Sequence, residues 1–151
     1  MTHTTVWGIG NPLLKDDAAG LETIRLLSEM KLEGFSLRSC ELAPANYLGT
    51  LKRERPQKFY LVDASDMGLP PGSLRRFPLE RIADPSFTSH DLPLNQLLET
   101  VLESETQAAV IAIQPATTDF GVGLSRPVSL AASKAASLIS EGRAGEIQEL
   151  E

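Results

Sequence analysis

Two uninterrupted apolar runs constrain the fold of this chain more than any other feature of its sequence. They are KFYLVDAS, residues 58–65, and AAVIAIQP, residues 108–115. A strand with one face in water alternates apolar and polar residues, whereas a strand covered on both faces reads as a continuous apolar run. The two runs therefore predict central strands of a parallel sheet that helices cover on both sides.

Segments with helical spacing alternate with these and other strands along the chain. Further strands are expected at TTVWGIG (4–10), FSLRSCEL (35–42) and, as a short one, LRRFPL (74–79). Helices are expected from Asp16 to before Gly34, over residues 45–55, after Pro93 and from near Pro127. This order predicts an α/β fold, a three-layer α/β/α sandwich with a mostly parallel, twisted sheet. We expect one domain over residues 1–151, with an acidic tail that frays from about residue 141.

Composition and charge exclude several classes of partner. The net charge is -6, with 20 acidic and 14 basic residues, which argues against nucleic acid or an anionic membrane as the partner. The sequence shows neither a signal peptide nor an apolar segment long enough to span a bilayer. Cys40 is the single cysteine, so an intramolecular disulfide is excluded, and we interpret it as a small apolar residue. We expect a cytoplasmic protein.

The stretch GIGNPLLKDDAAG, residues 8–20, follows the first strand and invites comparison with a phosphate-binding loop. Gly8 and Gly10 fit the dinucleotide fingerprint, but Leu13 stands where the third glycine belongs, and the Gly-Lys-Ser/Thr of a P-loop is absent. Asp16 and Asp17 would also meet a bound phosphate with like charge at the start of the helix. Phosphate or nucleotide binding is therefore the weakest of the hypotheses kept below.

Polar residues gather where strands end in the predicted sheet. Asp16 or Asp17 follows the first strand, Asp63 ends a buried strand, and His90 lies in a loop before a helix. Ligands collect at the carboxyl edge of such sheets, and two carboxylates with an imidazole suit a divalent metal or general acid–base chemistry. The residues alone leave the alternative open that these are a helix cap, a turn residue and an ordinary loop histidine. Nucleophilic catalysis is weaker, because the G-x-S-x-G elbow is absent.

Four stretches taken together resemble the nickel–iron hydrogenase maturation endopeptidases: GIGNPLLKDDAAG, LVDASDMGLPPG, TSHDLPLNQLL and IQP. They look closest to the branch that processes the large subunit of formate-hydrogenlyase-type hydrogenases. The resemblance implies an aspartyl-type endopeptidase that removes the C-terminal extension of the nickel-loaded large-subunit precursor. It implies that Asp17, Asp63 and His90 contact the nickel and carry the catalysis. Asp16 is then expected to serve in capping and loop support.

The same resemblance implies that nickel arrives with the precursor, although another divalent metal could occupy the site in vitro. We expect a monomer, because a large substrate must reach the sheet edge. One departure stands out, since Ala18 occupies a place where the family commonly carries glycine. If that change disables the site, the chain would be a non-catalytic accessory protein that binds nickel or precursor, and this alternative is kept.

Overall fold

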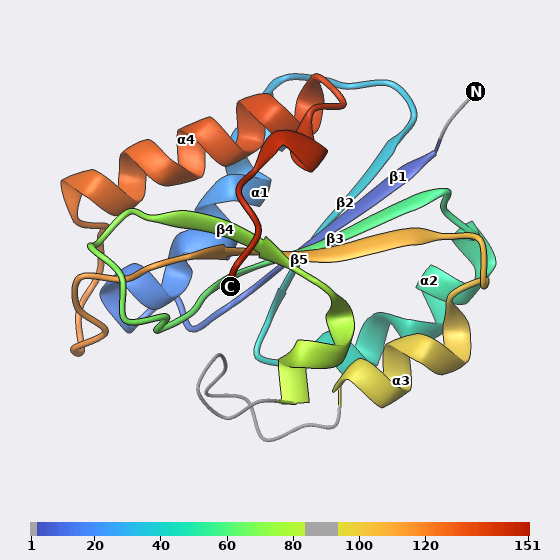
Figure 1. Cartoon of the computed structure of the whole chain (residues 1–151), viewed down its shortest axis with the longest axis horizontal. Coiled ribbons are helices and arrows are strands. Elements are labelled where there is room, and N and C mark those ends of the chain that lie inside the picture. The colour runs from blue at the N-terminus through green and yellow to red at the C-terminus, as the bar shows by residue number, and fades with distance from the viewer. Residues whose placement is uncertain (1–2, 84–93) are drawn as a thin grey trace.

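A five-stranded sheet forms the middle layer of the protein, in a computed structural model that describes residues 3–83 and 94–151 (Figure 1). The strand order is β2-β1-β3-β5-β4. All neighbouring pairs run parallel except β4 with β5, which are antiparallel. The expected α/β fold with a mostly parallel sheet is thereby confirmed. The strands are β1 (Thr4–Ile9), β2 (Phe35–Glu41), β3 (Lys58–Ala64), β4 (Leu74–Phe77) and β5 (Gln107–Ile113).

Helices cover both faces of this sheet (Figure 1). On one face α1 and α4 lie against each other, and α2 and α3 pack together on the opposite face. Short 3-10 turns lead into α1 and α2 and follow β4 and α4. The helices are α1 (Ala19–Glu29), α2 (Leu48–Glu54), α3 (Leu94–Val101) and α4 (Arg126–Ser140), and the 3-10 turns are η1 (Lys15–Ala18), η2 (Pro44–Tyr47), η3 (Leu79–Ala83) and η4 (Ala144–Glu146). Within the described residues, no helix is long and apolar enough to cross a membrane.

Alternation along the central strands divides the core into two halves. Val62 of β3 packs with the core beneath α1 and α4, whereas its neighbour Leu61 packs with the core beneath α2 and α3. Because both halves need apolar side chains, β3 and β5 read as the continuous apolar runs seen in the sequence. In the second half, the ring of Trp7 lies edge-on to Phe59, with 5.3 Å between ring centroids.

Two glycines let α1 approach the sheet more closely than a side chain would permit. A Cβ on Gly8 of β1 would lie 2.4 Å from the carbonyl oxygen of Gly20 in α1. A Cβ on Gly20 would in turn lie 2.2 Å from the carbonyl oxygen of Val62 in β3. The first turn of α1 therefore rests directly on the strand that carries Asp63, and the loop before α1 lies at the carboxyl edge of the sheet.

The C-terminal segment, expected to fray, instead packs against β4. The backbone N–H of Arg76 donates to the carbonyl of Gln148 at 2.9 Å, and the N–H of Leu150 donates to the carbonyl of Arg76 at 2.9 Å. Ile147 is buried in the core beneath α1 and α4. The tail therefore covers the outer edge of β4, which would otherwise offer unpaired backbone groups. The acidic composition of the tail gave no indication of this role.

Candidate functional site

The carboxyl ends of β1, β3 and β5 meet at one edge of the sheet, because these three strands run parallel. The loop after β1 continues into η1, which lies against β3. Asp17 belongs to η1, and Asp63 lies near the end of β3. The structure therefore brings two of the three predicted site residues to neighbouring elements at this edge. His90, the third, lies outside the described residues.

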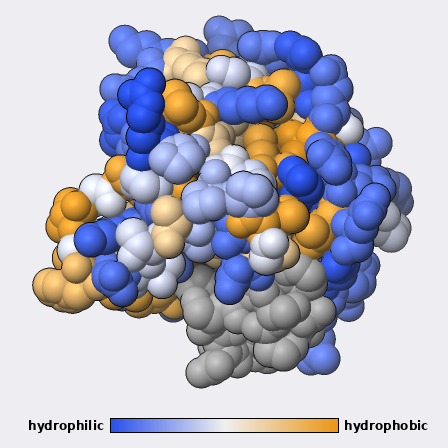
Figure 2. Space-filling view, turned by 60° about the vertical axis from the view of Figure 1, so that its left-hand side comes forward, coloured by the Kyte–Doolittle hydropathy of each residue, from blue (hydrophilic) through white to orange (hydrophobic). Residues whose placement is uncertain are grey.

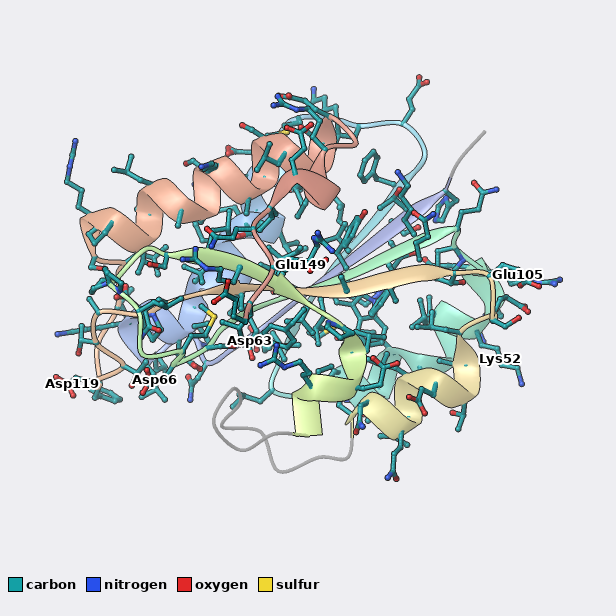
Figure 3. All side chains as sticks on the ribbon, in the orientation of Figure 1. Lys52, Asp63, Asp66, Glu105, Asp119 and Glu149 are labelled. Carbon is teal, nitrogen blue, oxygen red and sulfur yellow. The ribbon has the colours of Figure 1, made fainter. Side chains whose placement is uncertain are left out.

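Asp63 is the penultimate residue of β3 and pairs in register with Ala112 of β5. It is buried, with 4% of its surface exposed. Figure 3 shows Asp63 toward the middle of the molecule, whereas Asp66 and Asp119 lie further out, near its left-hand side. A carboxylate held this deep in the sheet has little freedom of position, which favours a role that depends on fixed geometry.

Asp17 is also buried, with 8% of its surface exposed, and its carboxylate has a fixed orientation. Its Oδ2 accepts a hydrogen bond of 2.7 Å from the backbone N–H of Asn11. The chain can fold back in this way because residue 10 is a glycine, which adopts a φ of +148° and has no Cβ. A Cβ at this position would lie 2.0 Å from the carbonyl oxygen of Asp17. The absence of a side chain at Gly10 thus permits this close approach of backbone to backbone.

Asp16 points to a different set of partners and is fully buried. Its Oδ2 accepts from the backbone N–H groups of Ala116 (2.9 Å) and Thr117 (3.3 Å) and from the hydroxyl of Ser125 (2.7 Å). Its Oδ1 accepts from the backbone N–H of Ser125 at 2.7 Å. Burial favours the neutral acid, but these hydrogen bonds, led by those from Ser125, outweigh it and hold the pKa of Asp16 below its usual value.

The predicted N-cap on α1 is therefore wrong, whereas the expected loop-supporting role of Asp16 agrees with its contacts. The N-cap position of α1 is Ala18, which makes no side-chain cap bond, and the two aspartates precede it within η1. Asp16 instead joins η1 to the segment between β5 and α4. The two loops are also joined by their backbones, since Lys15 donates to Gly121 at 3.0 Å and Gly121 donates to Leu13 at 2.8 Å.

Gln114 supports the segment beyond Asp63 and was not singled out by sequence reasoning. Its side-chain oxygen accepts from the backbone N–H groups of Met67 (2.6 Å) and Leu69 (3.3 Å), and its amide nitrogen donates to Asp66 at 3.2 Å. The side chain therefore fixes the loop that follows β3. The signal in the sequence was a polar residue directly after an apolar run. Ser125, the hydrogen-bond partner of Asp16, also had a signal, because it is a polar residue placed just before the Arg-Pro start of α4.

The chemistry available at this edge is that of carboxylates. In residues 3–83 and 94–151, no three His, Cys, Asp or Glu side chains come together as a metal site, so a third ligand to Asp17 and Asp63 would come from elsewhere. Cys40 offers no reactive thiol, because burial raises its pKa to about 12 despite the nearby Arg38. Two buried carboxylates can accept a proton from water or bind a divalent metal.

Comparisons with known proteins identify the family of this chain. The family model described as "Hydrogenase maturation protease" matches residues 42–141. The hydrogenase 3 maturation protease of Escherichia coli K12 is 29% identical over 121 residues, which are 80% of this chain and 78% of that protein.

Solved structures show the same relationship. The solution structure of the endopeptidase HycI from E. coli aligns with a TM-score of 0.86 and 28% identity, covering 100% of this chain and 97% of that chain. The crystal structure of the [NiFe] hydrogenase maturation protease HycI from Thermococcus kodakarensis aligns with a TM-score of 0.81 and 27% identity, covering 94% and 92% of the two chains. This chain therefore belongs to the hydrogenase maturation protease family and is an endopeptidase.

Proposed function

We propose that this chain removes the C-terminal extension of a nickel-loaded hydrogenase large-subunit precursor, and that Asp17, Asp63 and His90 form its site. The observation that carries the proposal is the placement of two buried carboxylates, Asp17 and Asp63, on adjoining elements at the carboxyl edge of the sheet. Family membership supports the substrate, since the related proteins are named hydrogenase maturation proteases. His90 enters through the resemblance of the segment TSHDLPLN to that family.

Nickel belongs to the substrate in this proposal. Two carboxylates and one imidazole provide oxygen and nitrogen ligands that suit a divalent transition metal with open positions. The remaining ligands would be those with which the precursor already holds its nickel. Recognition of nickel ties cleavage to a correctly loaded precursor, because an empty precursor lacks the element that these residues bind.

The residues of this chain would also handle the proton of the hydrolytic water. A carboxylate within hydrogen-bond reach of water acts as a general base, as in aspartyl-type peptidases, and Asp17 and Asp63 are the candidates. The hydrogen bond from Asn11 fixes Asp17 in one orientation, and the register of β3 with β5 fixes Asp63. A polypeptide extended along the sheet edge would then present its scissile carbonyl to groups that are already in place.

The decisive experiment follows the intact mass of purified precursor incubated with this protein, with nickel loaded and with nickel omitted. We expect the precursor to be shortened at its C-terminus only when nickel is loaded. Asp17→Asn, Asp63→Asn and His90→Ala should each abolish the shortening without changing the thermal unfolding temperature. Asp119→Asn is the matched control, because Asp119 is an exposed aspartate on a neighbouring loop and should keep full activity.

Other outcomes would assign the chain differently. Tight binding of nickel-loaded precursor without any shortening would indicate the accessory protein that only binds nickel or precursor. A rise in unfolding temperature with ATP or NAD, and none with precursor, would favour the phosphate-binding hypothesis, since a ligand that binds the native state stabilises it. Full processing by all three site variants would contradict the assignment of Asp17, Asp63 and His90.

Three further expectations belong to the same proposal. Free nickel, or another divalent metal, should bind weakly in isothermal titration calorimetry, because the chain supplies only part of the coordination sphere. The protein should sediment as a monomer that binds one precursor. We place the reaction in the cytoplasm, in keeping with a chain that has a single, buried cysteine and needs no oxidising compartment.

A further inference from the structure

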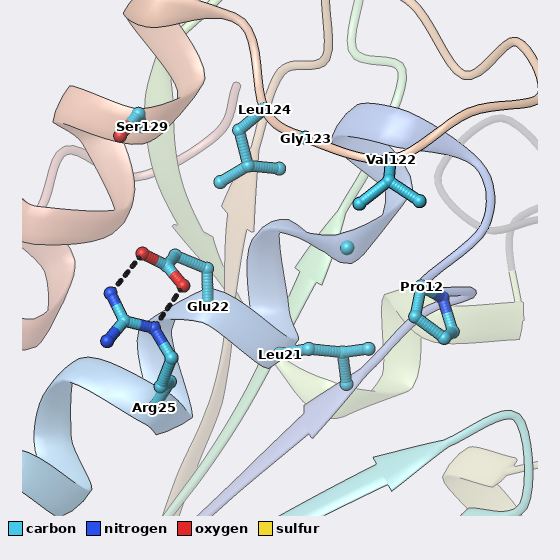
Figure 4. A pocket seen from close by; sticks show the side chains of 9 residues that line it. Pro12, Leu21, Glu22, Arg25, Val122, Gly123, Leu124 and Ser129 are labelled. Carbon is cyan, nitrogen blue, oxygen red and sulfur yellow. Dashed lines mark hydrogen bonds and ion pairs between the residues drawn. The ribbon is translucent and has the colours of Figure 1, made fainter.

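A surface pocket of about 430 Å³ lies beside the loop that carries Asp17 (Figure 4). One wall comes from the loop after β1 and the beginning of α1, and the other from the loop that precedes α4. Its apolar lining consists of Pro12, Ala18, Leu21, Val122 and Leu124. Figure 4 shows Leu21, Val122 and Pro12 around the same opening, although they come from segments about 100 residues apart in the sequence.

The two loops that form this pocket also expose large hydrophobic side chains. Leu13 is 50% exposed, Phe120 80% and Val122 83%. These loops are held together by the backbone hydrogen bonds between Gly121 and its partners Leu13 and Lys15, so the side chains form one surface. Figure 2 shows hydrophobic surface exposed between hydrophilic regions on the face that it presents. Clustered exposed apolar groups mark sites that bind a partner.

Two residues that line the pocket are next in sequence to Asp17 or to its hydrogen-bond partner Asn11. Pro12 follows Asn11, whose N–H is bound to the carboxylate of Asp17, and Ala18 follows Asp17 itself. An extended peptide advances about 3.3 Å per residue. Since consecutive Cα atoms are about 3.8 Å apart, Ala18 in the pocket wall lies about one residue length of such a peptide from Asp17.

The charges at the pocket wall favour an uncharged occupant. Arg25 is the cation in the lining, and it donates to both carboxylate oxygens of Glu22, at 2.7 and 2.8 Å, and to Glu29 at 2.9 Å. Dashed lines in Figure 4 mark the pairing of Arg25 with Glu22. Since Glu22 neutralises this guanidinium within the lining, the pocket wall carries no net charge to attract an ionic group.

We propose that this pocket receives an apolar side chain of the precursor polypeptide, within one or two residues of the bond that is cleaved. The inference deepens the proposed function and rests on it, because the occupant is the substrate of that reaction. The pocket would then contribute to choosing the cleaved bond, since a precursor with a charged residue at that position would lose the apolar contact and leave a charge against Val122 and Leu21.

Steady-state processing of nickel-loaded precursor by Val122→Asp tests this inference. We expect kcat/KM to fall about tenfold or more through a higher KM, which is the scale of losing the burial of one aliphatic side chain. Val122→Leu should keep the wild-type value, whereas Val122→Lys should lose as much as Val122→Asp, because the loss comes from polarity and not from the sign of the charge. Met30→Asp is the control, since Met30 is 40% exposed beyond the far end of α1 and should process normally.

The substrate side supplies a second arm. Each apolar residue within two positions of the cleaved bond is replaced by Asp in the precursor. One such replacement should raise KM for the wild-type protein about tenfold, yet add little further loss with Val122→Asp, because the two changes remove the same contact. Fully additive losses at every position would overturn the pocket assignment.

The outcomes separate the two proposals. If the wild-type protein does not shorten nickel-loaded precursor, the proposed function fails and the pocket assignment falls with it. If the wild-type protein shortens precursor and Val122→Asp does so with the same kcat/KM, only the pocket assignment is overturned. A wild-type protein that sediments as a dimer, with Val122→Asp monomeric and fully active, would also overturn it, because the surface would then bind a second copy.

Discussion

The two adjacent aspartates of the first loop have opposite surroundings. Within the part of the chain that the structure describes, Asp16 accepts four hydrogen bonds, all from the segment between β5 and the start of α4. Asp17 accepts one, from Asn11 of its own loop. The carboxylate of Asp16 uses its oxygens to join η1 to the segment before α4. The carboxylate of Asp17 keeps hydrogen-bonding capacity for a ligand.

One turn of 3-10 helix thus gives two neighbouring carboxylates different hydrogen-bond partners, and under the proposed function it divides stability and reactivity between them. Successive side chains of η1 point in different directions, so Asp16 faces the buried loop junction and Asp17 stays at the sheet edge near β3. Under the proposed function, Asp16 holds the loop in place and Asp17 takes part in the reaction. Replacing either carboxylate should therefore produce a distinct defect.

The largest expected effect is that of Asp17→Asn on activity. The rate of precursor processing should fall about 1000-fold, as expected for removal of a general base or metal ligand. The free energy of unfolding should change by less than about 0.5 kcal/mol, because the amide oxygen can still accept from Asn11. Urea unfolding measured beside the processing assay checks both halves, and a strongly destabilised variant would show that Asp17 is structural.

Asp16→Asn should lower the free energy of unfolding by about 3 kcal/mol. The reason is that the NH₂ group of the asparagine would face N–H and O–H donors in a buried site, where the carboxylate oxygens of Asp16 accept from them. The unfolding midpoint in urea measures this loss. Under conditions where the variant remains folded, it should still process precursor within about tenfold of the wild-type rate. A variant with wild-type stability and no activity would reverse the roles assigned to Asp16 and Asp17.

Gly10→Ala should lower the free energy of unfolding by about 2 kcal/mol. The added methyl group would lie 2.0 Å from the carbonyl oxygen of Asp17, and the φ of +148° disfavours alanine. Because the same clash displaces Asp17, processing should weaken as well. Gly123→Ala is the matched control: its φ is also positive, but nothing lies within 4 Å of the added methyl group, so it should be destabilised less and keep Asp17 in place.

Ser125→Ala removes one charge-assisted hydrogen bond, that of the hydroxyl to Asp16 at 2.7 Å, and leaves the backbone N–H of residue 125 in place. The loss in free energy of unfolding should be about 1.5 kcal/mol. In a double-mutant cycle with Asp16→Asn, the two losses should be less than additive. Additive losses would mean that the hydroxyl stabilises the fold independently of Asp16.

The smallest expected effect is the dependence of the Asp16 contribution on pH. The pKa of Asp16 is lower in the folded protein than its usual value of 3.8, so the contribution of its ionisation is fully present above 3.8 and is lost as pH falls through the lower, folded pKa. The stability difference between wild type and Asp16→Asn should shrink on acidification below that value. A difference that grows with acid would contradict the shift.

Local patterns in the sequence were sufficient to predict most of the fold. The apolar runs at residues 58–65 and 108–115 became β3 and β5, and Pro127 stands in the first turn of α4 as expected. Those features depend on neighbours in sequence and on burial from both sides. The same reasoning placed Asp63 and one member of the pair Asp16 and Asp17 at one sheet edge, because parallel strands share the direction of their ends. The family resemblance then singled out Asp17.

What sequence reasoning missed depends on contacts between distant segments. Asp16 reads as a cap in its local context, but its partner Ser125 lies 109 residues away. The tail reads as acidic and frayed, yet backbone hydrogen bonds, which carry no side-chain signature, join it to β4. Gln114 likewise gains its role only when β5 brings it beside the loop after β3. Pairings of this kind are set by the three-dimensional arrangement and leave little trace in local composition.

The most direct test of the division between the two aspartates is the processing rate at saturating nickel-loaded precursor, measured for Asp17→Asn and Asp16→Asn at one temperature where both are folded. We expect Asp16→Asn to be at least about 100-fold faster than Asp17→Asn. Equal rates for the two variants, or a faster Asp17→Asn, would contradict the account in which Asp17 reacts and Asp16 anchors the loop.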